Sequence, residues 1–76
     1  MSDPNEIAAL KASFRGAVGT AQTLAGWVER IEALDPHGDV SGADLEELQR
    51  ITAAHAIASA ALRGLVNTMI DRRTAA

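Results

Sequence analysis

The sequence predicts an all-α fold: an antiparallel helical hairpin, two copies of which form a four-helix bundle. Apolar residues recur every three or four positions through both halves of the 76-residue chain, and residues 35–38 (Asp-Pro-His-Gly) fit a tight turn between them. Residues 16–28 and 51–62 hold no Lys, Arg, Asp or Glu, and they lie at one level once the chain folds back. A lone hairpin keeps charges around its outer surface. We therefore expect a second copy to cover that level.

The first helix is predicted over residues 4–34. Asp3 suits the N-cap, Pro4 the first helical position, and Glu6 follows the cap by three residues, as in a capping box. The apolar positions that follow alternate spacings of three and four, which is the heptad seam of a helix packed along its length on another. They are Ile7, Leu10, Phe14, Ala17, Ala21, Leu24, Val28 and Ile31. Pro36 disfavours helical geometry in the residue before it, so we expect the helix to end at about residue 34.

A turn over residues 35–41 and a second helix over residues 42–72 complete the hairpin. Pro36 and Gly38 occupy the second and fourth positions of a type I turn. Ser41, with Asp44 three residues on, is a variant of the capping box and predicts the start of the second helix. Its seam is Leu48, Ile51, His55, Ala58, Leu62, Leu65 and Met69. Residues 1–76 thus form a single α-hairpin domain.

The central parts of both seams are expected to form the core of the dimer. That predicted core consists of Phe14, Ala17, Ala21, Leu24, Val28, Ile51, His55, Ala58, Leu62 and Leu65. Small residues at mid-height with larger ones toward the ends suit a four-helix bundle. Further apolar residues lie off the seams and could not be buried by two helices alone: Val18, Ala25, Trp27, Ile57, Val66 and Ile70. Glycines inside both helices are compatible with close approach of another backbone, or with tolerated surface positions.

Charge is segregated along the predicted rod. The turn end is mainly acidic, whereas the end that carries the termini is mainly basic. Two hairpins packed in opposite directions would set each acidic turn beside the basic end of the other copy. The sequence therefore predicts an antiparallel homodimer.

Composition excludes several classes of protein. The net charge is −3 with only seven Lys and Arg, so a general affinity for nucleic-acid backbone is not expected. With no cysteine, neither a disulfide nor a thiolate metal site can support so small a core, which leaves oligomerisation. We find no nucleophile beside a base and no glycine-rich phosphate loop, and we predict no enzyme activity and no catalytic, cofactor or metal site. The charge-free stretches are too short to cross a bilayer, and the acidic start is no signal peptide. The expectation is a soluble cytoplasmic protein without a membrane partner.

His55 is the only ionisable residue in either charge-free stretch. It could be a neutral core histidine, hydrogen-bonded to Thr52, Ser59 or a hydroxyl of the first helix such as Thr20. It could instead be a pH switch, or a metal or haem ligand at the dimer centre. We favour the core interpretation, because no second histidine, cysteine or carboxylate lies one turn away.

These features favour a small homodimeric interaction protein that regulates, inhibits or scaffolds a larger protein, such as a bacterial or phage accessory protein. The candidate partner surface consists of Lys11, Arg15, Trp27, Glu46, Glu47, Arg63, Arg72 and Arg73. Trp27 could anchor a partner or close the end of its own core. The alternatives are a nucleic-acid-associated regulator that uses the basic ends of the dimer, and a ligand- or metal-binding bundle centred on His55. In shape alone, the predicted dimer resembles the Rop family of plasmid-encoded hairpin dimers.

Overall fold

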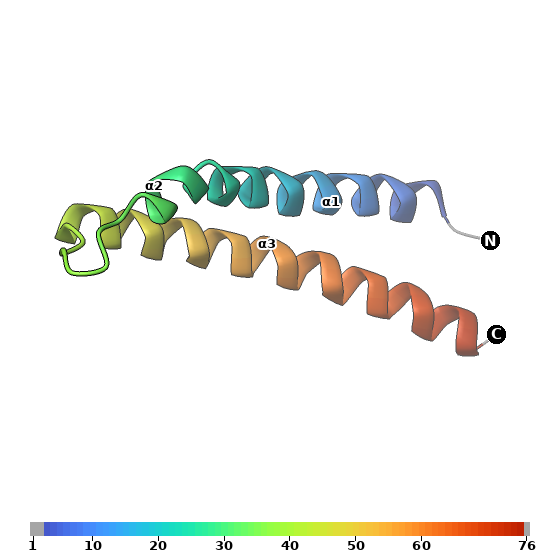
Figure 1. Ribbon diagram of the computed structural model, residues 1–76. Helices are drawn as coiled ribbons and strands as arrows, with labels where there is room; N and C mark the ends of the chain where they lie inside the picture. Colours follow the sequence, from blue (N-terminus) through green and yellow to red (C-terminus); the bar gives the residue numbers. More distant parts are fainter. Residues whose placement is uncertain (1–2, 76) are drawn as a thin grey trace.

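The computed structural model describes residues 3–75, which form an antiparallel helical hairpin (Figure 1). Helix α1 spans Pro4–Ala25, the short helix α2 spans Val28–Glu32, and α3 spans Gly42–Ala75. Helices α1 and α3 lie side by side along a rod with extents of 57 × 18 × 17 Å. No strand occurs within these residues. The predicted all-α hairpin is confirmed.

Both helix starts are capped as the sequence predicts. The Asp3 carboxylate accepts a hydrogen bond of 2.9 Å from the Asn5 N–H, with Pro4 in the first turn. The Ser41 hydroxyl oxygen accepts one of 3.1 Å from the Asp44 N–H, and α3 begins at Gly42. Glu6 does not reach back to its own cap, because its carboxylate pairs with the Arg72 guanidinium near the end of α3. Helix α3 also runs three residues beyond the predicted end, since no helix-breaking residue follows position 72.

The predicted continuous helix over residues 4–34 is wrong, because the chain breaks at Gly26 and Trp27. Helix α1 ends at Ala25 with Gly26 as its C-cap, and the Trp27 N–H bonds to the Leu24 carbonyl, three residues back, at 3.0 Å. This tighter step is typical of a 3₁₀ turn, and glycine has little preference for the helix interior. The Arg30 guanidinium lies 3.9 Å from the centre of the Trp27 ring, across the break. Helix α2 then ends at Glu32, two residues before the predicted end.

Residues of the turn between α2 and α3 supply hydrogen-bond acceptors for its backbone N–H groups. The Gly38 N–H donates to the Asp35 carbonyl at 2.9 Å, which is the bond expected of the predicted type I turn. The side chains of Asp35 and Asp39 accept from the N–H groups of His37 and Val40, at 3.0 and 2.9 Å. These local bonds hold the connection between α2 and α3 in a defined shape.

The structure confirms the predicted seam of α3 but only part of the seam predicted for the first helix. All seven predicted seam residues of α3 are buried or half-buried, and Ile51, only 7% exposed, is the one buried side chain among residues 3–75. On α1, only Leu10, Ala17 and Leu24 of the predicted seam face α3 in this way. The other predicted positions are exposed, and the residue just before each of four of them is half-buried instead. The exposed ones are Ile7, Phe14, Ala21, Val28 and, in α2, Ile31; the half-buried ones are Glu6, Ser13, Thr20 and Trp27.

Helix α1 is thus rotated relative to the prediction, by about half the angle of one helical position. Polar contacts with α3 explain the rotation. Thr20 bonds to His55, and Glu6 pairs with Arg72. With the predicted seam, Ala21 would stand in the place of Thr20 and offer His55 no hydrogen-bonding partner.

Candidate interaction face

The rotation of α1 leaves a second apolar stripe that nothing in the hairpin covers. Its positions again alternate spacings of four and three, so they share one side of α1 and continue into α2. The members are Ile7, Lys11, Phe14, Val18, Ala21, Ala25, Val28 and Glu32, and every one is exposed. We call this set the α1 stripe. Phe14 and Val28 are its most exposed large members, at 57% and 56%.

Val66 and Ile70 of α3 extend the α1 stripe into a broader apolar face. Phe14 lines a groove of about 610 Å³ between α1 and α3 together with Leu62 and Val66. A second groove of about 240 Å³ joins Val66 to Ile70, which is 55% exposed. These shared grooves show that the α1 stripe and this part of α3 lie on the same side of the rod. We call the combined surface the apolar face.

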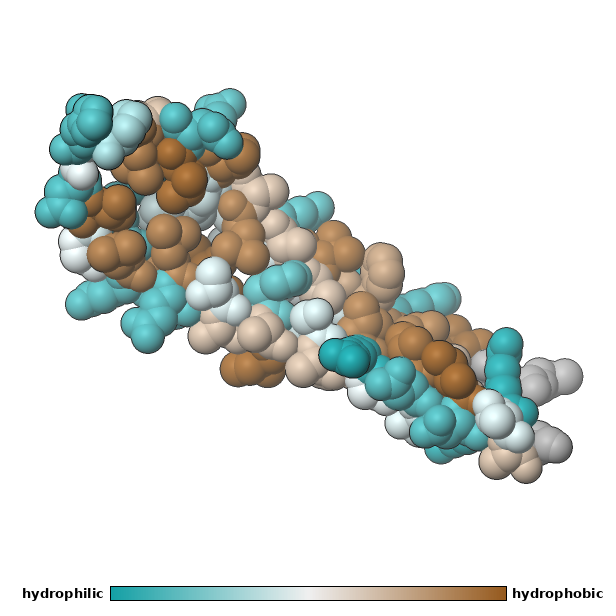
Figure 2. All heavy atoms as spheres, turned by 60° about the horizontal axis from the view of Figure 1, so that its bottom comes forward, coloured by the Kyte–Doolittle hydropathy of each residue, from teal (hydrophilic) through white to brown (hydrophobic). Residues whose placement is uncertain are grey.

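The apolar face has another groove at the turn end. Ala21, Ala25, Val28, Ile31 and Leu48 are among the residues that line it, and its volume is about 480 Å³. Large grooves thus lie toward both ends of this face. Viewed from nearer the α3 side, Figure 2 shows hydrophobic atoms at the surface near both ends of the rod and paler atoms between them.

The opposite side of the hairpin carries small residues. Gly16, Gly19 and Gly64 lie there, and a Cβ added at any of them would meet no other atom within 4 Å. Close packing inside the hairpin therefore does not require these glycines. Ile57, 73% exposed, is the large apolar side chain on this surface. We call this side the small-residue face.

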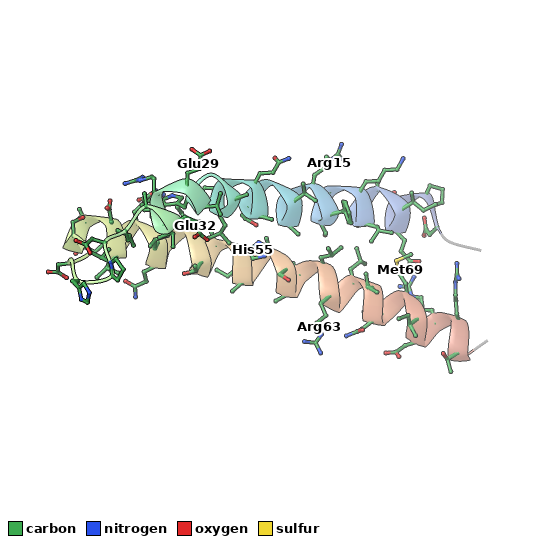
Figure 3. The ribbon with its side chains drawn as sticks, in the orientation of Figure 1. Arg15, Glu29, Glu32, His55, Arg63 and Met69 are labelled. Carbon is green, nitrogen blue, oxygen red and sulfur yellow. The ribbon has the colours of Figure 1, made fainter. Side chains whose placement is uncertain are left out.

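His55 lies between the two long helices, on the side of α3 that faces α1 (Figure 3). Its Nδ1 is 2.7 Å from the Thr20 hydroxyl oxygen, which is itself 3.0 Å from the Ala17 carbonyl and 3.2 Å from that of Gly16. The hydroxyl has one proton; when it donates to a carbonyl, His55 donates its Nδ1 proton to the hydroxyl oxygen. Thr20 is one of the partners that the sequence suggested. Within residues 3–75, no group of three His, Cys, Asp or Glu side chains is placed to hold a metal ion.

Three ion pairs link charges within the hairpin: Glu6 with Arg72, Arg30 with Asp44 at 3.0 Å, and Glu47 with Arg50. The remaining charges stay mainly segregated, with the acids Asp3 and Asp71 near the termini as exceptions. Four cations near the termini have no ion pair among the described residues: Lys11, Arg15, Arg63 and Arg73. Near the turn the same holds for five acids: Glu29, Glu32, Asp35, Asp39 and Glu46. In Figure 3, Arg15 and Glu29 point outward from α1 and α2, Arg63 points outward from α3, and Met69 lies between α1 and α3.

The predicted partner surface is therefore split. Arg72 and Glu47 are engaged in ion pairs within the chain, and Trp27 is half-buried beneath Arg30. The other five predicted residues are exposed: Lys11, Arg15, Glu46, Arg63 and Arg73. The predicted dimer core is split as well, because its α3 members face α1 whereas Phe14, Ala21 and Val28 belong to the apolar face.

Helix α1 carries two overlapping seams, and the predicted seam mixes positions from both. A repeat of spacings of four and three through Val18 and Ala25 would have revealed the second one.

No described helix is both long and apolar enough to span a membrane. Comparisons with protein-family models, with curated proteins and with solved structures give no match to the chain.

Proposed function

We propose that this chain is a small interaction protein that works as an antiparallel homodimer, a four-helix bundle, and binds a larger protein. The observation that carries the proposal is the surface left uncovered by one hairpin. Its accessible area is 5948 Å², and its mass is 7.9 kDa. A compact folded monomer of that mass exposes about 4,400 Å². The excess is about 1,500 Å² per chain, or about 3,000 Å² for a pair, which lies in the range of obligate homodimer interfaces.

The near absence of a core supports the same proposal. Ile51 alone is buried among residues 3–75, whereas six large apolar side chains are exposed on one side of the rod. These six are Ile7, Phe14, Val18, Val28, Val66 and Ile70. Contiguous apolar surface of this kind marks an interaction site. A second hairpin laid on the apolar face would give the four helices a common core.

Charge supports an antiparallel arrangement. The cations left unpaired near the termini and the acids left unpaired near the turn would meet across the interface only if the rods point in opposite directions. Rods pointing the same way would bring acidic turns together, and like charges in contact disfavour association.

A protein partner is supported by the surface that the dimer leaves outside. Once the apolar faces are joined, the small-residue face of each copy still points outward, with Ile57 73% exposed. Open space around Gly16, Gly19 and Gly64 lets the backbone of another helix come close. A helix or a flat protein surface therefore fits this side.

Affinity capture with matched variants tests the proposal. Ile57→Glu places a charge on the small-residue face, and Asn67→Glu places the same charge at an exposed position of α3 outside both faces. We expect both variants to remain dimeric by light scattering. We expect one protein to co-purify with the wild type and Asn67→Glu, and to be lost with Ile57→Glu. Equal capture by both variants would contradict the role of this face.

A nucleic-acid-associated regulator is the second candidate, and one observation favours it. Lys11, Arg15, Arg63 and Arg73 lie near the same end of the rod, and none has an ion pair within the described residues. Binding through them would weaken steeply with added salt. Fluorescence anisotropy with labelled duplex DNA and RNA at low salt tests this candidate, and no binding there would remove it. Antiparallel pairing disfavours it, because each basic end then lies beside an acidic turn.

A further inference from the structure

We infer that the α1 stripe is the surface through which two copies pair, with α1 lying antiparallel on α1 of the second copy and Phe14 facing the partner's Ala21 and Ala25. The inference rests on the proposed homodimer and names its contact surface. It starts from the exposure of all eight members of the α1 stripe in a single hairpin. A helix of this chain thus has two seams, of which α3 covers only one.

The order of side-chain sizes along the α1 stripe favours pairing with itself in reverse. Ile7 and Phe14 fill the half near the N-terminus, whereas Ala21 and Ala25 occupy the other half before Val28. When one copy of α1 is reversed over another, the two stripes cross near Val18. Phe14 then lies over the alanines of the partner, and Ile7 lies toward Val28. Large side chains facing small ones fill the space between helices at native density.

The charges within the α1 stripe agree with this direction. Lys11 and Glu32 are its only charged members, and they lie toward opposite ends. With the crossing at Val18, Lys11 of each copy lies over Ala25 of the other, and the Glu32 of that other copy is about seven residues, or about 10 Å, farther along the axis. Neither residue has an ion pair within the described part of its own chain. The two-fold axis repeats this approach of opposite charges at both ends of the interface, as a self-complementary interface requires.

Pairing α1 with α3 of a second copy fits less well. That arrangement makes the rods point the same way and sets the acidic turns side by side. It also places Phe14 over the part of α3 that bears Ser59 and Arg63, on the same side of that helix as Val66. A polar and charged surface would then cover an exposed phenyl ring, and the desolvated charge would have no partner.

Single cysteines test the inference directly, since the chain has none of its own. Val18→Cys lies close to the crossing point, so its two copies come together and a short bis-maleimide should join them. Ala12→Cys, at an exposed position of α1 outside the stripe, is the control. Cysteine is close in size to valine, and circular dichroism checks that both variants remain helical. We expect efficient cross-linking of Val18→Cys, and little of Ala12→Cys, at the same concentration.

Mixing two variants provides a second readout. Ile7→Cys and Val28→Cys should cross-link weakly alone and strongly when combined, because antiparallel pairing brings residue 7 of one copy near residue 28 of the other. If the wild type is dimeric but Val18→Cys does not cross-link above the control and the mixture gives no gain, the α1 interface is wrong while the proposed homodimer stands. If the wild type is monomeric, the proposed homodimer and the inference both fail.

Discussion

Phe14 gives the clearest perturbation of the proposed dimer. Its side chain is 57% exposed in the hairpin, on the face where we place the second copy. An aromatic side chain buries about 200 Å² at most, so pairing removes roughly 110 Å² of it from water. At about 25 cal/mol per Å², and with a methyl group retained, Phe14→Ala should cost about 2 kcal/mol per chain. The dimer contains two copies, so the dissociation constant should rise by roughly a thousandfold.

Sedimentation velocity across a concentration series measures this change, and circular dichroism on the same samples follows the helix content. Ile57→Ala is the matched control, because Ile57 is more exposed than Phe14, at 73%, but lies on the small-residue face. We expect its dissociation constant to match that of the wild type. Equal weakening by both substitutions would show a non-specific hydrophobic effect, and no weakening by Phe14→Ala would refute the reasoning.

Three other substitutions test the hairpin itself, each by urea unfolding followed by circular dichroism. Ile51→Ala truncates the one buried side chain of residues 3–75 and should lower the free energy of unfolding by about 2–4 kcal/mol. A loss below about 1 kcal/mol would contradict the predicted seam. Gly64→Ala adds a Cβ that meets nothing within 4 Å, so it should raise the free energy of unfolding by about 1 kcal/mol. A destabilised variant would reveal a contact at Gly64 that is absent from the single hairpin. His55→Leu gives up one hydrogen bond to Thr20, of about 1 kcal/mol net, and gains apolar burial on the seam, so stability should stay within about 1 kcal/mol of the wild type or increase. A large loss would instead assign His55 a structural role that leucine cannot fill.

Local signals in the sequence were sufficient to predict most of the hairpin. Asp3, Ser41 and the turn residue Pro36 act within a few positions of themselves, and the structure places both helix starts and the turn where they predict. The seam of α3 was also correct at every position. The break at Gly26 was missed because a heptad pattern continues across it and a glycine alone does not stop a helix.

The seam of α1 could not be chosen from the sequence by apolarity alone. Phe14 is more apolar than Ser13, and Ala21 is more apolar than Thr20. A choice by apolarity therefore selects Phe14 and Ala21, which are exposed to solvent in the single hairpin. The face turned to α3 depends on cross-helix partners, namely His55 for Thr20 and Arg72 for Glu6. Such partners lie far along the chain, and periodicity carries no information about them. The predicted positions that do not face α3, such as Phe14 and Ala21, belong instead to the surface that we expect a second copy to cover.

Sedimentation equilibrium of the wild-type chain tests the central claim most directly. At micromolar concentration the homodimer has twice the chain mass of 7.9 kDa, with the helix content of the hairpin. We expect that mass, unchanged over at least a tenfold range of concentration. A stably folded, helical monomer of 7.9 kDa over the same range would contradict it.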